Sequence, residues 1–121
     1  MANDFKRFTV ADVNTSAGAS ASAVYTVPSS SSTAVESIVL GITLANKSSS
    51  GVTASVFLDN YDGTNDVYIV KDASIPAGSS LEVMSGNKLV LQGDGTTNDA
   101  IRVSASASSS VDATVSVLED V

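Results

Sequence analysis

Apolar and polar residues alternate along most of the chain, most clearly in its last third. In residues 101–105 and 111–118, every second side chain is apolar. A period of two is that of a β-strand with one buried face, whereas an amphipathic helix repeats its apolar positions every three to four residues. The pattern therefore predicts a chain of strands with close to no helix.

Extended to the whole chain, the same pattern predicts strands separated by loops rich in Ser, Gly, Asn and Asp. The predicted strands are residues 8–13, 23–27, 34–45, 52–58, 67–71, 81–84, 88–92, 101–105 and 111–118. We expect residues 81–84 and 88–92 to pair with each other across a turn at 85–87. Short strands that recur about every ten residues are typical of a sandwich or barrel. The prediction is an all-β, single-domain antiparallel β-sandwich, jelly-roll or immunoglobulin-like, of eight or nine short strands.

The strand predicted at residues 34–45 is the most apolar of the chain and is expected to be central in its sheet. Its alternation predicts one face with Ile38, Leu40, Ile42 and Leu44, and the other with Val39, Gly41, Thr43 and Ala45. In the strand at residues 52–58, the same alternation turns Val56 and Leu58 inward and Phe57 outward.

Length and composition fit one domain, residues 1–121, with a core of its own. The chain has 121 residues, too few for two separate cores, and 43% of them are hydrophobic. Thirteen acidic residues against six basic ones give a net charge of −7, which repels phosphate backbones, so we expect no nucleic-acid partner. No stretch approaches the ~20 apolar residues of a membrane span, and no apolar secretory segment is visible at the start. We expect a protein made in the cytoplasm, with no membrane partner.

Two residue types that carry much of enzyme chemistry are missing. Without His or Cys, the chain lacks the commonest general base and the thiolate nucleophile. Serines are too numerous for any one to mark a Ser–Lys site. Three Tyr, three Phe and no Trp are few for a cleft around a carboxylate pair. We therefore expect no enzyme activity, no catalytic residue and no cofactor.

Two acidic loops, residues 59–66 and 93–99, raise the question of calcium. An EF-hand loop needs oxygen ligands at alternating positions, but the third residue counted from Asp59 is Tyr61. Asp-Gly and Asn-Asp pairs are also ordinary turn chemistry. We expect hairpin loops with solvated carboxylates and predict no metal site, while calcium binding by these loops stays an open alternative.

Residues suited to protein contacts cluster near the start of the chain: Phe5, Lys6, Arg7 and Phe8. One interpretation is an edge strand with Phe8 and Val10 facing the core. The other is a docking arm, residues 1–7, that lies on a neighbouring subunit, because aromatic residues beside Arg are typical of interface anchors. Outward-facing Phe57 and the loop residue Tyr61 are the next candidates for contact residues.

Several segments are specific enough to compare with known families: "MANDFKRFTVADV", "VYTVP", "GITLANKSSSGVTASVFL" and "VYIVKDASIPAGSSLEVMSGNKLVLQGDG". Together they resemble small virion structural proteins of tailed bacteriophages, particularly phages of marine cyanobacteria, and the resemblance covers nearly the whole chain. Its most specific part is the order "IPAGSSLEV", "KLVLQ", "IRV" and "VDATVSVLE". The resemblance implies a β-sandwich used as a decoration, collar or tail-associated component of the virion, with no catalytic residues to carry over.

The partners that the resemblance implies are capsid, neck or tail proteins of the phage. We expect a homo-oligomer, a trimer or higher ring, which is made in the host cytoplasm and assembles on the capsid or the head-tail region. The alternative is a host-recognition or carbohydrate-binding module on a tail fibre or spike. Sugar stacking usually needs exposed aromatic rings, and Tyr61 is the one plausible platform for it.

Overall fold

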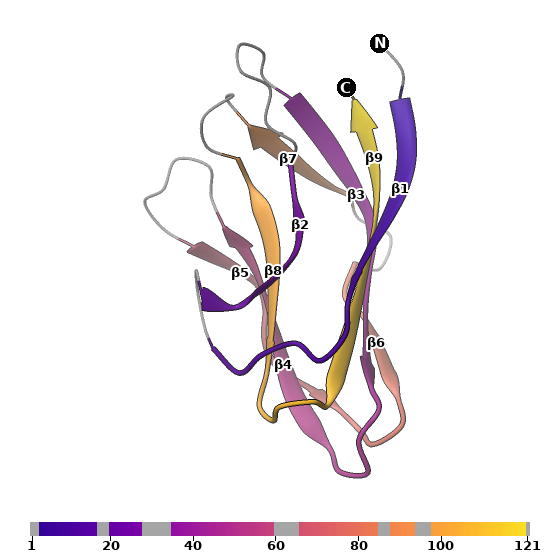
Figure 1. Cartoon of the computed structure of the whole chain (residues 1–121), viewed down its shortest axis with the longest axis vertical. Helices are drawn as coiled ribbons and strands as arrows, with labels where there is room; N and C mark the ends of the chain where they lie inside the picture. The colour runs from indigo at the N-terminus through magenta and orange to yellow at the C-terminus, as the bar shows by residue number, and fades with distance from the viewer. Residues whose placement is uncertain are drawn as a thin grey trace.

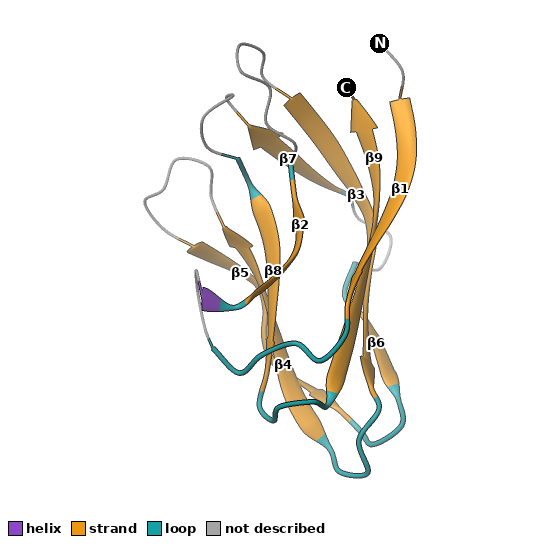
Figure 2. Ribbon diagram, viewed as in Figure 1, coloured by secondary structure: helices purple, strands orange, loops and turns teal. Residues whose placement is uncertain are grey.

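The computed structural model describes residues 3–16, 20–27, 35–59, 66–84, 88–93 and 98–120. Nine strands follow one another in these residues: β1 (Asn3–Val10), β2 (Ser22–Thr26), β3 (Val35–Asn46), β4 (Val52–Asp59), β5 (Asp66–Ile75), β6 (Ser80–Glu82), β7 (Leu89–Gly93), β8 (Ala100–Ala105) and β9 (Val111–Asp120). Within the described ranges, the only helical position is Ser20, in a 3₁₀ turn (Figure 2). The predicted all-β class and strand number are confirmed.

The strands form two antiparallel sheets that face each other (Figure 1). One sheet has the order β1-β9-β3-β6, with β7 also paired to β3, and the other has the order β2-β8-β4-β5. Each early strand thus pairs with a late one: β1 with β9, β2 with β8, β3 with β6 and β7, and β4 with β5. This is the pairing of a long hairpin rolled into a sandwich, the arrangement called a jelly roll.

The expected hairpin between the strands near residues 81–84 and 88–92 is wrong. In the structure, β6 pairs with Thr43, Leu44 and Ala45 of β3, and β7 pairs with the beginning of the same strand. β3 has 12 residues, a length of about 40 Å, so both short strands fit end to end along its edge. The two segments share one long partner and do not pair with each other.

The core lies between the two sheets and consists mainly of Val, Ile, Leu and Ala. In β9, the inward residues Val111, Ala113, Val115 and Val117 are 0%, 1%, 0% and 0% exposed, as the alternation predicted. Burying one Val side chain contributes about 1.5–3 kcal/mol. The core therefore strongly favours the register in which these residues face inward.

One predicted face assignment, that of β3, is wrong because the strand contains a β-bulge. The register with β9 shifts between Val39 and Gly41, so that one extra residue lies on the β3 side. Val39 and Ile42 are both 0% exposed, whereas Leu40 is 36% exposed. The extra residue reverses the alternation, so Val39 joins the core and Leu40 moves to the outer face.

Asn46, at the end of β3, fastens two loops at the same end of the sandwich. Its side-chain nitrogen donates to the backbone oxygens of Ser50 at 2.8 Å, Ile75 at 3.0 Å and Pro76 at 3.3 Å. Its side-chain oxygen accepts from the backbone nitrogen of Ser48 at 3.0 Å. Asn46 is 2% exposed, so these partners replace water as the source of its hydrogen bonds.

We predict that Asn46→Ala lowers the free energy of unfolding by about 2 kcal/mol, because it leaves buried or half-buried carbonyl groups without a donor. Urea denaturation followed by far-ultraviolet circular dichroism measures the change. The matched control is Ser49→Ala in the same loop, whose exposed side chain should change the free energy by less than about 0.5 kcal/mol. Equal stability of the two variants would contradict the role given to Asn46.

Candidate interaction surface

The outer face of the first sheet carries four apolar side chains side by side. Phe5 is paired with Leu118, Leu118 with Ile38, and Ile38 with Val90. Directly opposed residues of neighbouring strands lie on the same face of a sheet, so the four residues form one line across β1, β9, β3 and β7. Phe5 is 77% exposed and Val90 is 55% exposed, while Leu118 and Ile38 are half-buried. We call these four residues the apolar row.

Polar positions flank the apolar row on both sides. The register places Asn3, Asp120, Glu36 and Gln92 in the next line toward the chain ends. On the other side come Arg7 and Ser116, and beyond them lie Thr9, Thr114 and Thr43. The apolar side chains are therefore concentrated in a narrow band, with Leu40 at its border because of the β3 bulge.

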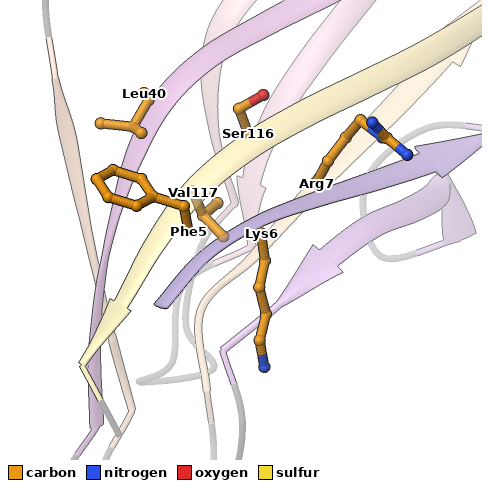
Figure 3. A pocket seen from close by; sticks show the side chains of 6 residues that line it. All are labelled: Phe5, Lys6, Arg7, Leu40, Ser116 and Val117. Atoms are coloured by element: carbon orange, nitrogen blue, oxygen red, sulfur yellow. The ribbon is translucent and has the colours of Figure 1, made fainter. Parts of the chain in front are cut away.

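A shallow groove of about 560 Å³ lies beside the apolar row (Figure 3). Its lining consists of Phe5, Lys6, Arg7, Leu40, Ser116 and Val117. Ser116 has the smallest side chain of this lining. Figure 3 shows Phe5 and Leu40 close together on one side of Ser116 and Arg7 on the other.

The four contact residues predicted near the start of the chain divide between the two faces of β1. Phe5 and Arg7 point outward, and Arg7 is exposed with no ion pair among the described residues. Phe8 points inward, where its ring lies 4.7 Å from that of Tyr25. Phe8 and Val10 pack against the core, as the edge-strand interpretation predicted. Of the four predicted contact residues, Phe5 and Arg7 thus point toward the outer surface that carries the groove.

Lys6 faces inward and binds a buried carboxylate that the sequence analysis missed. Its Nζ lies 2.9 Å from Oε1 of Glu119, which is 1% exposed. The Tyr25 hydroxyl donates to the Glu119 Oε2 at 2.6 Å and lies 2.7 Å from the Ser37 hydroxyl. These contacts join β1, β2, β3 and β9. In the sequence, Glu119 resembles an ordinary polar residue near a chain end, and only its inward position in β9 could have marked it.

The pKa values of this cluster follow from burial and charge. Burial raises the pKa of the Glu119 carboxyl, but the hydrogen bond from Tyr25 and the Lys6 ammonium lower it by more, so the pKa lies below its ordinary value. Burial, and then the hydrogen bond to Glu119, raises the pKa of the Tyr25 hydroxyl well above its ordinary value. At neutral pH the cluster therefore contains a carboxylate, an ammonium group and a neutral phenol.

The other two predicted contact residues are Phe57 and Tyr61. Phe57 does lie on the outer face of its sheet, but the expectation that it is exposed is wrong, because it is 3% exposed. Its register partners are Tyr68 on β5 and Arg102 on β8, and the Tyr68 ring lies 4.7 Å away. These larger neighbours cover Phe57, and Tyr68 is the exposed ring instead, with the Lys71 ammonium 5.4 Å from its centre. Tyr61 lies outside the described residues.

Among the described residues, no three His, Cys, Asp or Glu side chains are grouped so that they could hold a metal ion. Most of both acidic loops lies outside the described residues, and Asp59, at the edge of one loop, forms an ion pair with Arg102 at 2.8 Å. No helix in the described part of the chain is long and apolar enough to span a membrane.

Comparison of the chain with protein-family models, curated proteins and solved structures gives no match. The apolar row and the groove are thus the features of this chain on which a functional proposal can be built. They bring together three of the predicted contact residues, Phe5, Lys6 and Arg7, with residues of β3, β7 and β9 that were not predicted to make contacts.

We predict that the Glu119 cluster makes the free energy of unfolding decrease as the pH falls. Because the pKa of Glu119 is lower in the folded than in the unfolded chain, the unfolded chain binds more protons as the pH falls. The stabilisation is present above the ordinary pKa of 4.5 and is lost as the pH falls through the lower pKa of the folded state. Urea denaturation between about pH 3 and pH 8 should show a shallower acid decline for Glu119→Gln than for the wild type.

The control for this experiment is Glu36→Gln, which changes an exposed carboxylate of the same sheet. Glu36→Gln should keep the wild-type decline in acid. At neutral pH, Glu119→Gln should be less stable than the wild type, because Lys6 loses its charged partner. An unchanged acid decline in Glu119→Gln would contradict the interpretation.

Proposed function

We propose that the chain is a non-enzymatic structural protein of a tailed phage virion, which assembles through contacts between subunits at the outer face of its first sheet. The observation that carries the proposal is the apolar row, in which an aromatic side chain 77% exposed to solvent begins a line of four apolar residues. The phage setting comes from the sequence resemblance, which implies partners on the capsid, neck or tail.

The composition of the face suits a protein contact. Interface centres are enriched in aromatic residues and Arg and have polar rims. Phe5, Arg7 and Leu40 surround the groove, and polar positions lie on both sides of the apolar row. A contiguous apolar band between polar positions on an exposed sheet face is typical of an interaction site.

The face is also held in place before any partner arrives. β1 pairs with β9 over eight residues, and Lys6 binds the buried Glu119 from the opposite side of the strand. Phe5 therefore projects from a fixed backbone. Binding costs less conformational entropy when the contact residues are ordered in advance, so a modest face can give a specific contact.

The jelly roll occurs in viral capsid proteins and in lectins, so the fold is compatible with both the structural role and the carbohydrate-binding alternative. For the alternative, a free aromatic platform is needed. The exposed ring of Tyr68 already contacts Phe57 and Lys71, and no other observation on the described residues favours sugar binding. The structural role is therefore the proposal that we retain.

We expect purified particles of the phage that carries this gene to contain the protein in a fixed copy number, measured by quantitative mass spectrometry. Particles that lack the protein should bind the added wild type, and Phe5→Asp should reduce this binding by roughly ten-fold or more, because a charge replaces an apolar anchor. The matched control is Val67→Asp, which changes a residue 46% exposed on β5.

Two results would contradict the proposed function. One is the absence of the protein from virions, and the other is equal attachment of the wild type and Phe5→Asp. A glycan array tests the alternative with the same purified protein, since specific sugar binding that survives Phe5→Asp would favour a recognition module.

A further inference from the structure

We infer that the ion pair between Lys6 and Glu119 regulates the interaction surface: it holds residues 3–7 of β1 in the sheet, and protonation of Glu119 releases them while the rest of the sandwich stays folded. Residues 3–7 include Phe5 and Arg7, so their release removes the most exposed side chain of the apolar row. The inference rests on the proposed function and deepens it, because it names a condition that abolishes the contact.

The two halves of β1 are attached to the sandwich by different contacts on their inner face. In the second half, Phe8 and Val10 pack against the core, and the Phe8 ring lies 4.7 Å from that of Tyr25. In the first half, Lys6 makes a charged contact instead, with Glu119 at 2.9 Å. Acid weakens a contact between opposite charges but does not change apolar packing. The second half of β1 can therefore stay packed when the first half detaches.

The position of residues 3–7 allows them to open alone. β1 is the first strand in the order β1-β9-β3-β6, at the edge of the sheet, and its described ladder is the one with β9. Detachment of residues 3–7 breaks part of this one ladder, whereas detachment of β9 would break the ladders with both β1 and β3. Segments with few buried apolar contacts open with less free energy than the strands of the core.

Glu119 is the group whose protonation changes the contact. The side chains described around it are Lys6 on β1, Tyr25 on β2 and, next to the Tyr25 hydroxyl, Ser37 on β3. Serine does not titrate, and lysine and tyrosine titrate at about pH 10, far above neutral. Of these four groups, Glu119 is thus the one that changes charge in acid. Asp4 is opposite Glu119 in the register, so the experiment below includes it.

Protonation and release are linked. Burial raises the pKa of the Glu119 carboxyl, but the Tyr25 hydrogen bond and the Lys6 ammonium lower it by more, so the pKa lies below its ordinary value of 4.5. Release removes the ammonium, so the pKa is higher in the released state than in the attached state. A fall in pH therefore shifts the equilibrium toward release, while at neutral pH the ion pair is intact.

Amide hydrogen exchange of the purified full chain tests the inference, measured residue by residue by NMR from about pH 7 to pH 3 and corrected for the intrinsic effect of pH. In the wild type, opening of residues 3–7 should increase roughly ten-fold in acid, whereas opening of β4 and β8 should not. Glu119→Gln should show the increased opening already at neutral pH. The controls, Glu36→Gln and Asp4→Asn, should keep the wild-type response.

The effect on the interaction surface is measured with particles that lack the protein. At neutral pH, Glu119→Gln should attach roughly several-fold more weakly than the wild type, because binding must first order residues 3–7. Circular dichroism and melting temperature check that the variant is folded under the conditions of the assay.

The outcomes separate this inference from the proposed function. Opening of residues 3–7 that does not respond to acid, opening of all strands together, or loss of the response in Asp4→Asn would overturn the inference. Equal attachment of Glu119→Gln and the wild type would overturn the regulation of the surface. If the protein is absent from virions, the proposed function falls, and the exchange measurement still decides whether Glu119 controls residues 3–7.

Discussion

The two antiparallel ladders on either side of β9 are the constraint on which the rest of the structure depends. β9 is paired with β1 on one side and with β3 on the other, and its inward residues are almost fully buried. A shift of one residue would turn Val115 and Val117 toward solvent and Leu118 into the core. The core therefore selects the register, and the register in turn lines up Phe5, Leu118 and Ile38 on the outside. The packing of the inner face therefore determines which residues form the apolar row.

Glu119, on the inner face of β9, helps to fix β1, the strand that carries Phe5 on its outer face. An isolated carboxylate in the interior would be costly, but Lys6 and Tyr25 supply a charge and a hydrogen bond. Lys6 is on β1 and Tyr25 is on β2, so Glu119 links the last strand, β9, to the first two strands. The edge strand that carries Phe5 is thereby fixed by a backbone ladder and by a polar contact on its inner face.

Alternation along the sequence was enough to predict the number of strands and the sandwich, because a period of two is a local signal that burial of one face enforces. The first strand, predicted at residues 8–13, spans Asn3–Val10 in the structure. Alternation failed where a non-local partner decides the outcome. The bulge in β3 places Leu40 on the outer face. β6 and β7 both pair with the long edge of β3 and not with each other. Larger neighbours on adjacent strands cover Phe57. Phe5 and Arg7 were predicted contact residues, but the apolar row could not be read from the sequence, since it joins four strands whose register only the fold defines.

The register also brings Asn3 and Asp120 opposite each other, so the first and last strands have their free ends at one pole of the sandwich (Figure 1). The connections at residues 46–51, 76–79 and 106–110 lie at the other pole. An affinity tag or fused domain on either terminus would be tethered next to Phe5 and could crowd it. A cargo peptide inserted between Ser108 and Ser109, which are both exposed, would be carried at the far tip, away from the loops that Asn46 holds, which makes that connection the better position for labelling or display.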